Sequence, residues 1–187
     1  NGADLQEACA MSETLAAVGT ARVAEGRMRG MVCLITGGGT GIGRATALKM
    51  AAEGAEAVIV AGRREAELEQ AAVQCRELGA DALAIRTDVT RESEVAQLVQ
   101  TALDRYGRID VAFNNAGFQE RRAPLEQQAS NVYDDVFDAN VRSVFLCLRA
   151  QLAAMFARGQ GRIVVNASVS GVRNPNAGLA LYSASKA

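Results

Sequence analysis

Two residues near the end of the chain have types and a spacing that suit proton transfer. Tyr182 and Lys186 are four positions apart, so in a helix their side chains would share one face. A free phenol is a poor base at neutral pH, but a neighbouring ammonium favours the phenolate. Such a tyrosine could give a proton to a carbonyl oxygen or take one from an alcohol. The pattern Tyr-x-x-x-Lys is common, so its meaning depends on where the fold places it.

A glycine-rich stretch, Thr36-Gly37-Gly38-Gly39-Thr40-Gly41-Ile42-Gly43, lies between an apolar run and an amphipathic run. Glycines let the backbone turn sharply and approach a pyrophosphate, and the N-terminus of the following helix would offer unpaired N–H donors. The stretch therefore predicts a cradle for a dinucleotide. A glycine-rich turn between a strand and a helix, without a ligand, is the alternative.

The residues after the second apolar run bear on which dinucleotide would bind. Folds that bind NAD commonly place Asp or Glu there to contact the adenosine ribose, whereas this chain has Gly62 followed by Arg63 and Arg64. Without that carboxylate a 2′-phosphate is not repelled, and a guanidinium can pair with it. We therefore expect NADP, with NAD as the second choice. The alternative is that both arginines simply begin a solvated helix.

Two further short patterns follow predicted strands. Asp88 could accept a hydrogen bond from an adenine amino group, or could cap the next helix. The run Asn114-Asn115-Ala116-Gly117 offers small residues beside which a cofactor could lie, and amides that could hold neighbouring loops. Taken alone, this run is as consistent with a structural turn as with a binding element.

Short apolar runs alternate with amphipathic stretches from residue 31 onward, which favours an α/β fold with a parallel sheet covered on both faces. The strands are expected at 31–36, 57–61, 82–86, 109–113 and 162–166. The helices are expected at 41–53, 65–78, 91–106 and 130–157.

Composition narrows the classes of function. The net charge of −1 gives no reason to expect nucleic acid or an anionic membrane as a partner, and no apolar run approaches the roughly 20 residues of a membrane span. The chain has no histidine, which excludes Ser-His-Asp and Cys-His catalysis. Its four cysteines follow no metal-ligand spacing, so we expect no metal site and reduced thiols in a cytoplasmic protein.

Taken in order, these motifs resemble the short-chain dehydrogenase/reductase family in its non-extended form, over about residues 30–187. The resemblance implies a Rossmann-type, doubly wound sheet with strand order 3-2-1-4-5. It also implies an NAD(P)-dependent oxidoreductase that transfers hydride between the cofactor and a small-molecule carbonyl or secondary alcohol. The motifs that carry it are the glycine-rich stretch, Asp88-Val89, Asn114-Asn115-Ala116-Gly117, Asn140, Ser168 and Tyr182-Ser183-Ala184-Ser185-Lys186.

The resemblance assigns roles residue by residue. Tyr182 would be the acid/base, and Lys186 would assist it and hold the nicotinamide ribose. Ser168 would bind the substrate oxygen, with Ser170 as the second candidate, and Asn140 would anchor a water in the proton relay. The implied cofactor contacts are Gly37, Thr40, Gly41, Ile42, Gly43, Arg63, Asp88, Val89, Asn114, Ala116, Gly117, Tyr182 and Lys186.

Family members continue past this point with two more strands, so we expect strands 6 and 7 to be missing. Residues 29–187 would form the cofactor-binding domain, incomplete at its C-terminus, and residues 1–28 an extension that is loosely helical or disordered. The complete protein would be a homo-oligomer. Two alternatives remain open: an inactive fragment, and a cofactor-binding regulatory protein on the same scaffold. The Ser, Tyr and Lys residues argue against the regulatory protein, because a regulator needs no acid/base.

Overall fold

The computed structural model describes residues 26–173 and 177–187. They form a five-stranded parallel sheet with the order β3-β2-β1-β4-β5, as expected. The strands are β1 (Val32–Thr36), β2 (Ala57–Gly62), β3 (Asp81–Arg86), β4 (Val111–Asn114) and β5 (Arg162–Val165). The α-helices are α2 (Gly41–Ala52), α3 (Glu65–Glu77), α4 (Glu92–Tyr106), α5 (Ser130–Phe137), α6 (Ser143–Arg158) and α7 (Ala180–Lys186).

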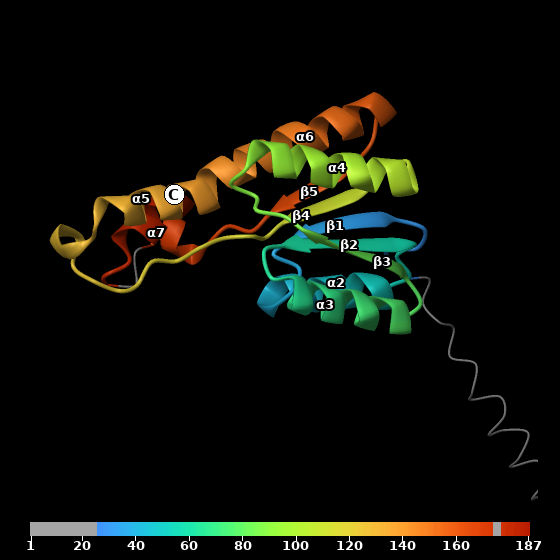
Figure 1. Ribbon diagram of the computed structural model, residues 1–187, viewed down its shortest axis with the longest axis horizontal. Helices are drawn as coiled ribbons and strands as arrows, with labels where there is room; N and C mark the ends of the chain where they lie inside the picture. The colour runs from blue at the N-terminus through green and yellow to red at the C-terminus, as the bar shows by residue number, and fades with distance from the viewer. Residues whose placement is uncertain (1–25, 174–176) are drawn as a thin grey trace, which may run out of the picture.

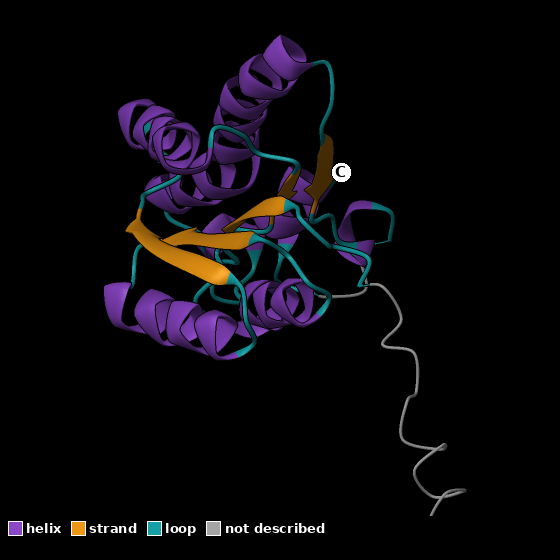
Figure 2. Ribbon diagram, turned by 90° about the vertical axis from the view of Figure 1, so that its right-hand side faces the viewer, coloured by secondary structure: helices purple, strands orange, loops and turns teal. Residues whose placement is uncertain are grey.

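Helices cover both faces of the sheet, as Figures 1 and 2 show: α2 and α3 lie on one side, and α4 and α6 on the other. Alternate residues of a strand point to opposite faces, so each central strand supplies both layers of the core. In β1, Cys33 and Ile35 pack toward α2 and α3, whereas Val32 and Leu34 pack toward α4 and α6. Fully apolar strands are therefore required here, and the sequence supplies them.

The edge strand β5 differs from the central strands. It pairs with β4 alone among the described residues, and the side chains of Val164 and Val165 remain 54% and 41% exposed. An exposed apolar strand edge is a surface on which further chain can pair.

The predicted long helix from 130 to 157 is interrupted. Helix α5 passes into a π-helical turn, Asp138–Arg142, before α6 begins. The turn holds one extra residue per turn and directs the buried Asn140 side chain at the loop after β4, where it bonds to the backbone of Phe118. Residues 130–157 are thus helical as predicted, with a π-helical turn that the prediction did not include.

Most of the predicted N-terminal extension, residues 1–25, lies outside the described residues. Residues 26–28 are bound to the domain: the Met28 amide donates to the carbonyl of Glu53, 3.1 Å away, at the end of α2. No helix among residues 26–173 and 177–187 is long and apolar enough to cross a membrane.

Candidate active site

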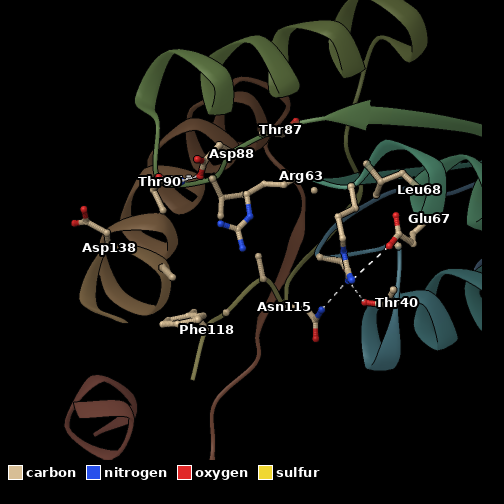
Figure 3. Close-up of a pocket in the computed structure, with 18 of the residues that line it drawn as sticks. Thr40, Arg63, Glu67, Leu68, Thr87, Asp88, Thr90, Asn115, Phe118 and Asp138 are labelled. Atoms are coloured by element: carbon tan, nitrogen blue, oxygen red, sulfur yellow. Dashed lines mark hydrogen bonds and ion pairs between the residues drawn. The ribbon is translucent and has the colours of Figure 1, made fainter. Parts of the chain in front are cut away.

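A cavity of about 660 Å³ lies beyond the carboxyl ends of the strands, where the residues that follow β1, β2, β3 and β4 converge (Figure 3). In an open parallel sheet this edge is where ligands bind. Seven of the predicted cofactor contacts line the cavity: Gly37, Thr40, Arg63, Asp88, Val89, Ala116 and Gly117. Gly41, Ile42, Gly43 and Asn114 do not line it, and neither do the four predicted catalytic residues.

The glycine-rich turn has the backbone that its sequence predicts. Gly37 has φ +66, which side-chain-bearing residues rarely adopt. A Cβ at Gly43 would lie only 2.2 Å from the carbonyl oxygen of Gly37, so the first turn of α2 packs directly on the loop. Thr40 precedes α2 without a side-chain capping bond, and no acidic residue lies in the first turn. Within residues 26–173 and 177–187, no side chain caps the N–H donors of this helix end, which suits a bound phosphate.

Two arginines stand at the end of β2 (Figure 3). Arg64 donates to the hydroxyl of Thr40 at 2.9 Å and pairs with the carboxylate of Glu67 at 3.4 Å. Arg63 extends into the cavity toward Asp88, and its charge helps to lower the pKa of that carboxyl. Both arginines are exposed and directly precede α3, as the alternative of a solvated helix start expects, and both also line the cavity beside the glycine-rich turn.

Asp88 does not cap α4, which begins at Glu92 after Arg91. Its Oδ1 instead accepts from the amide and the hydroxyl of Thr90, at 3.1 and 2.8 Å, and so closes a tight turn. Partial burial acts to raise the pKa of this carboxyl, but the Thr90 bonds and the nearby arginines outweigh it, and the net shift is downward. Capping of the next helix, one of the two roles considered for Asp88, is therefore not observed, and the residue lines the cavity.

The two consecutive asparagines have different functions because successive strand residues face opposite ways. Asn114 is buried and exchanges two side-chain hydrogen bonds with Gln151 of α6, each 2.8 Å long. Its side chain thus belongs to the core. Asn115 lines the cavity and donates to the carbonyls of Thr36 and Gly37, at 3.2 and 3.3 Å. The amide that holds the loop is Asn115, which the predicted contacts did not include.

Tyr182 and Lys186 share one face of α7 as predicted. The ammonium nitrogen of Lys186 lies 5.9 Å from the ring centroid of Tyr182 and donates to the carbonyl of Asn166 at 3.1 Å. Burial lowers the pKa of Lys186. A Cβ at Gly117 would lie 3.0 Å from Asn140 Oδ1 and 3.7 Å from Lys186 Nζ, so these two side chains adjoin the rim of the cavity that Gly117 lines.

Ser168 precedes a 3₁₀ turn, η3 (Val169–Gly171), and its hydroxyl accepts from the Ser170 amide at 3.2 Å. Ser170 is buried and Ser168 is partly exposed, so Ser168 is the better placed of the two to meet a ligand. The turn packs against α7: a Cβ at Gly171 would lie 1.8 Å from the Lys186 carbonyl oxygen. The residues from 174 to 176, between this turn and α7, lie outside the described residues.

Three residues that position the site were not among the predicted site residues. Ser185 accepts from Asn140 Nδ2 at 2.9 Å and donates to the Tyr182 carbonyl at 2.8 Å. Asn166 donates to Asn115 Oδ1 at 3.0 Å. Glu120 accepts hydrogen bonds from the amides of Leu181 and Tyr182. Across the described ranges, no three His, Cys, Asp or Glu side chains gather as a metal ion would need.

The family model for short chain dehydrogenases matches residues 31–187. The chain belongs to this family. An A-factor type gamma-butyrolactone 1′-reductase of Streptomyces virginiae is 42% identical over 147 residues, which are 79% of this chain and 57% of that protein. Levodione reductase of Leifsonia aquatica is 42% identical over 148 residues, 79% of this chain and 55% of that protein.

The solved structures of family members agree with the fold. NAD⁺-bound xylitol dehydrogenase superposes with a TM-score of 0.82 at 38% identity, covering 86% of this chain and 61% of that one. A levodione reductase structure gives a TM-score of 0.82 at 38% identity, covering 86% of this chain and 62% of that one. The matched segment of this chain thus spans less than two thirds of these relatives.

Proposed function

We propose that the complete protein containing this chain is an NAD(P)-dependent oxidoreductase that acts on a carbonyl compound or a secondary alcohol, with Tyr182 as the acid/base. The observation that carries the proposal is the placement of α7: Tyr182 and Lys186 lie on one face of a helix whose ammonium adjoins Gly117 at the cavity rim. Acid/base residues beside a phosphate-binding turn are what hydride-transfer chemistry requires of the protein.

Each residue would have a separate role in the reaction. The nicotinamide cofactor supplies or accepts the hydride. Tyr182 would give a proton to the carbonyl oxygen, or take it from the alcohol, while Ser168 would hold the same oxygen by a hydrogen bond. Lys186 would place a positive charge beside the phenol and favour its phenolate form. Asn140, whose carbonyl oxygen has a second lone pair besides the one bonded to Phe118, would anchor a water for proton exchange.

The cofactor would be NADP in preference to NAD. Gly37, Thr40, Gly41, Ile42 and Gly43 would surround the phosphates at the start of α2. Arg63, with Arg64 beside it, would pair with a 2′-phosphate at the end of β2. The last residue of β2 is Gly62, so this position has no carboxylate side chain to repel the phosphate. Asp88 and Val89 would face the adenine. A solved relative, xylitol dehydrogenase, binds NAD⁺. Titration with both cofactors therefore decides between NADP and NAD.

A small-molecule substrate fits the proposal, since relatives of this chain are named as reductases of a gamma-butyrolactone and of levodione. A homo-oligomer fits as well: Phe145 and Phe156 of α6 are 58% and 78% exposed, and a second copy would cover them. The described cysteines Cys33, Cys75 and Cys147 are free and buried, which supports the proposed reducing, cytoplasmic location.

The experiment that tests the function replaces Tyr182 by Phe in the full-length protein and measures turnover and NADPH affinity. We expect turnover to fall by at least about a hundredfold, the scale of general acid/base catalysis, because only the proton-transferring oxygen is lost. The NADPH dissociation constant should change little. Tyr133→Phe is the matched control, since that exposed phenol lies on α5. Substantial activity in the Tyr182 variant would remove Tyr182 as the acid/base and favour a cofactor-binding regulator.

A further inference from the structure

Glu120 is a buried carboxylate at the beginning of α7. It lies in the loop between β4 and the short turn η1 (Leu125–Gln127), and only 2% of it is exposed. Its Oε1 accepts hydrogen bonds from the amides of Leu181 and Tyr182, and its Oε2 accepts a further one from Tyr182, all at 3.1 Å. A residue 62 positions away along the chain thus bonds directly to the backbone of the proposed acid/base.

The first amides of a helix have no partner within the helix and need an acceptor from elsewhere. In α7 the residue at the cap position is Leu179, which has no side-chain acceptor and makes no capping bond. The Glu120 carboxylate supplies the missing acceptor. A bond from an amide to a carboxylate is charge-assisted, and the negative charge also suits the positive end of a helix. Burying this carboxylate is tolerable because these bonds replace its hydration.

The rest of α7 is held from two other directions. Asn140 donates to Ser185, and Lys186 donates to the carbonyl of Asn166 at the end of β5. Helix α7 has seven residues, and a helix this short has little stability of its own. Its position is therefore set by contacts with other segments, among which the Glu120 bonds hold the N-terminal turn and the amide of Tyr182.

We propose that Glu120 is a positioning residue for the Tyr182 phenol: by fixing the Leu181 and Tyr182 amides, it sets the direction in which the Tyr182 side chain leaves the helix. This inference rests on the proposed function of Tyr182 as the acid/base. The carboxylate touches the backbone alone in these bonds, so its effect reaches the reacting atoms only through Tyr182. Catalysis is sensitive to such placement, because a displacement of about 1 Å can cost about a hundredfold in rate.

The experiment compares Glu120→Gln and Glu120→Ala in the full-length protein with Glu126→Gln, a matched control in the exposed turn η1 of the same loop. Glu120→Ala should lower kcat by at least about tenfold, as displacement of a catalytic group does, while the NADPH dissociation constant stays within about threefold. Glu120→Gln should restore most of the rate, because its amide oxygen still accepts a hydrogen bond. Glu126→Gln should match the wild type.

A second measurement is independent of activity: hydrogen exchange of the Leu181 and Tyr182 amides in the absence of substrate. Both should exchange at least about tenfold faster in Glu120→Ala, while core amides of β1 are unchanged. Unchanged exchange at these two amides, or a kcat within about twofold of wild type, overturns the proposal. So does an equal loss of rate in the Gln and Ala variants. A wild-type protein that turns over no carbonyl compound defeats the proposed function, whereas the exchange result still tests the placement of Tyr182.

Discussion

The side chains of Asn166 and Asn115 are joined by a hydrogen bond of 3.0 Å, from the amide of the first to the carbonyl oxygen of the second. Asn115 in turn donates to the carbonyl of Gly37 in the glycine-rich turn, and the carbonyl of Asn166 accepts from Lys186. The proposed phosphate cradle and the proposed proton-transfer pair are therefore tied together through two asparagines at the carboxyl edge of the sheet. Neither half of the site can move far without the other.

The cofactor preference is tested by Arg63→Asp. The wild type should bind NADPH several-fold more tightly than NADH, and the variant should reverse the order by losing about tenfold in NADPH affinity, the scale of a lost charge-assisted hydrogen bond. Dissociation constants from fluorescence titration of both cofactors measure this. Arg162→Asp, which makes the same change of charge at the start of β5 on the opposite edge of the sheet, should leave the order intact. Equal constants before and after the Arg63 change would contradict the preference.

A pH-dependent stability is expected from Asp110, just before β4. Partial burial acts to raise the pKa of this carboxyl, but bonds from the Val32 amide, Arg158 and Arg108 outweigh it, and the pKa lies below its usual value of 3.8. A carboxyl with a lowered pKa in the folded state stabilises the fold above its unfolded pKa and loses that contribution as the pH falls through the folded one. Asp110→Asn should therefore lower the free energy of unfolding at pH 7 by about 2 kcal/mol.

The deficit of that variant should shrink as the pH falls below about 3.8, because the carboxyl of the unfolded chain then takes up a proton, and it should vanish once the pH is below the lowered pKa of the folded state. Denaturant unfolding at several pH values measures both effects. Asp104→Asn is a suitable control, because Asp104 is an exposed carboxylate on α4. A deficit that stayed constant from pH 7 to pH 2 would show that lost packing, not charge, causes it.

The close approach of α2 to the glycine-rich turn is tested by Gly43→Ala. The added methyl group would meet the Gly37 carbonyl oxygen at 2.2 Å, and a backbone atom cannot turn away as a side chain can. We expect a loss of about 1–3 kcal/mol in the free energy of unfolding, together with weaker cofactor binding. Gly62→Ala is the control for stability, since its Cβ would make an ordinary contact of 3.6 Å with Leu68. Equal stability of the two variants would contradict the expectation.

The sheet and the glycine-rich turn could be predicted because their signals are local. Apolar runs such as 57–61 identify a buried parallel strand, and the glycines mark a turn where backbone packs on backbone. The four-residue spacing of Tyr182 and Lys186 also predicted that they would share one helix face.

The tethers between segments could not be predicted in this way. Glu120 and Leu181 are 61 positions apart, and Asn140 and Ser185 are 45 apart, so no periodicity connects them. The π-helical turn could not be predicted either, because the bonds between Asn140 and the loop after β4 that accompany it join residues 22 positions apart. Capping was one of the two roles considered for Asp88, and the sequence could not exclude it because an Asx turn and a cap share the same residue types.

The position of β1 in the middle of the sheet has a consequence for how the chain emerges during synthesis. One neighbour of β1, strand β2, follows soon after it, but the other, β4, is made much later: the contact between Thr36 and Asn115 spans 79 positions. Until β4 leaves the ribosome, the buried strand β1 can pair with β2 but not with its second neighbour, and one of its edges stays unpaired. We expect the nascent chain to depend on chaperones over that interval, and slow decoding between β3 and β4 to lower the yield of folded protein.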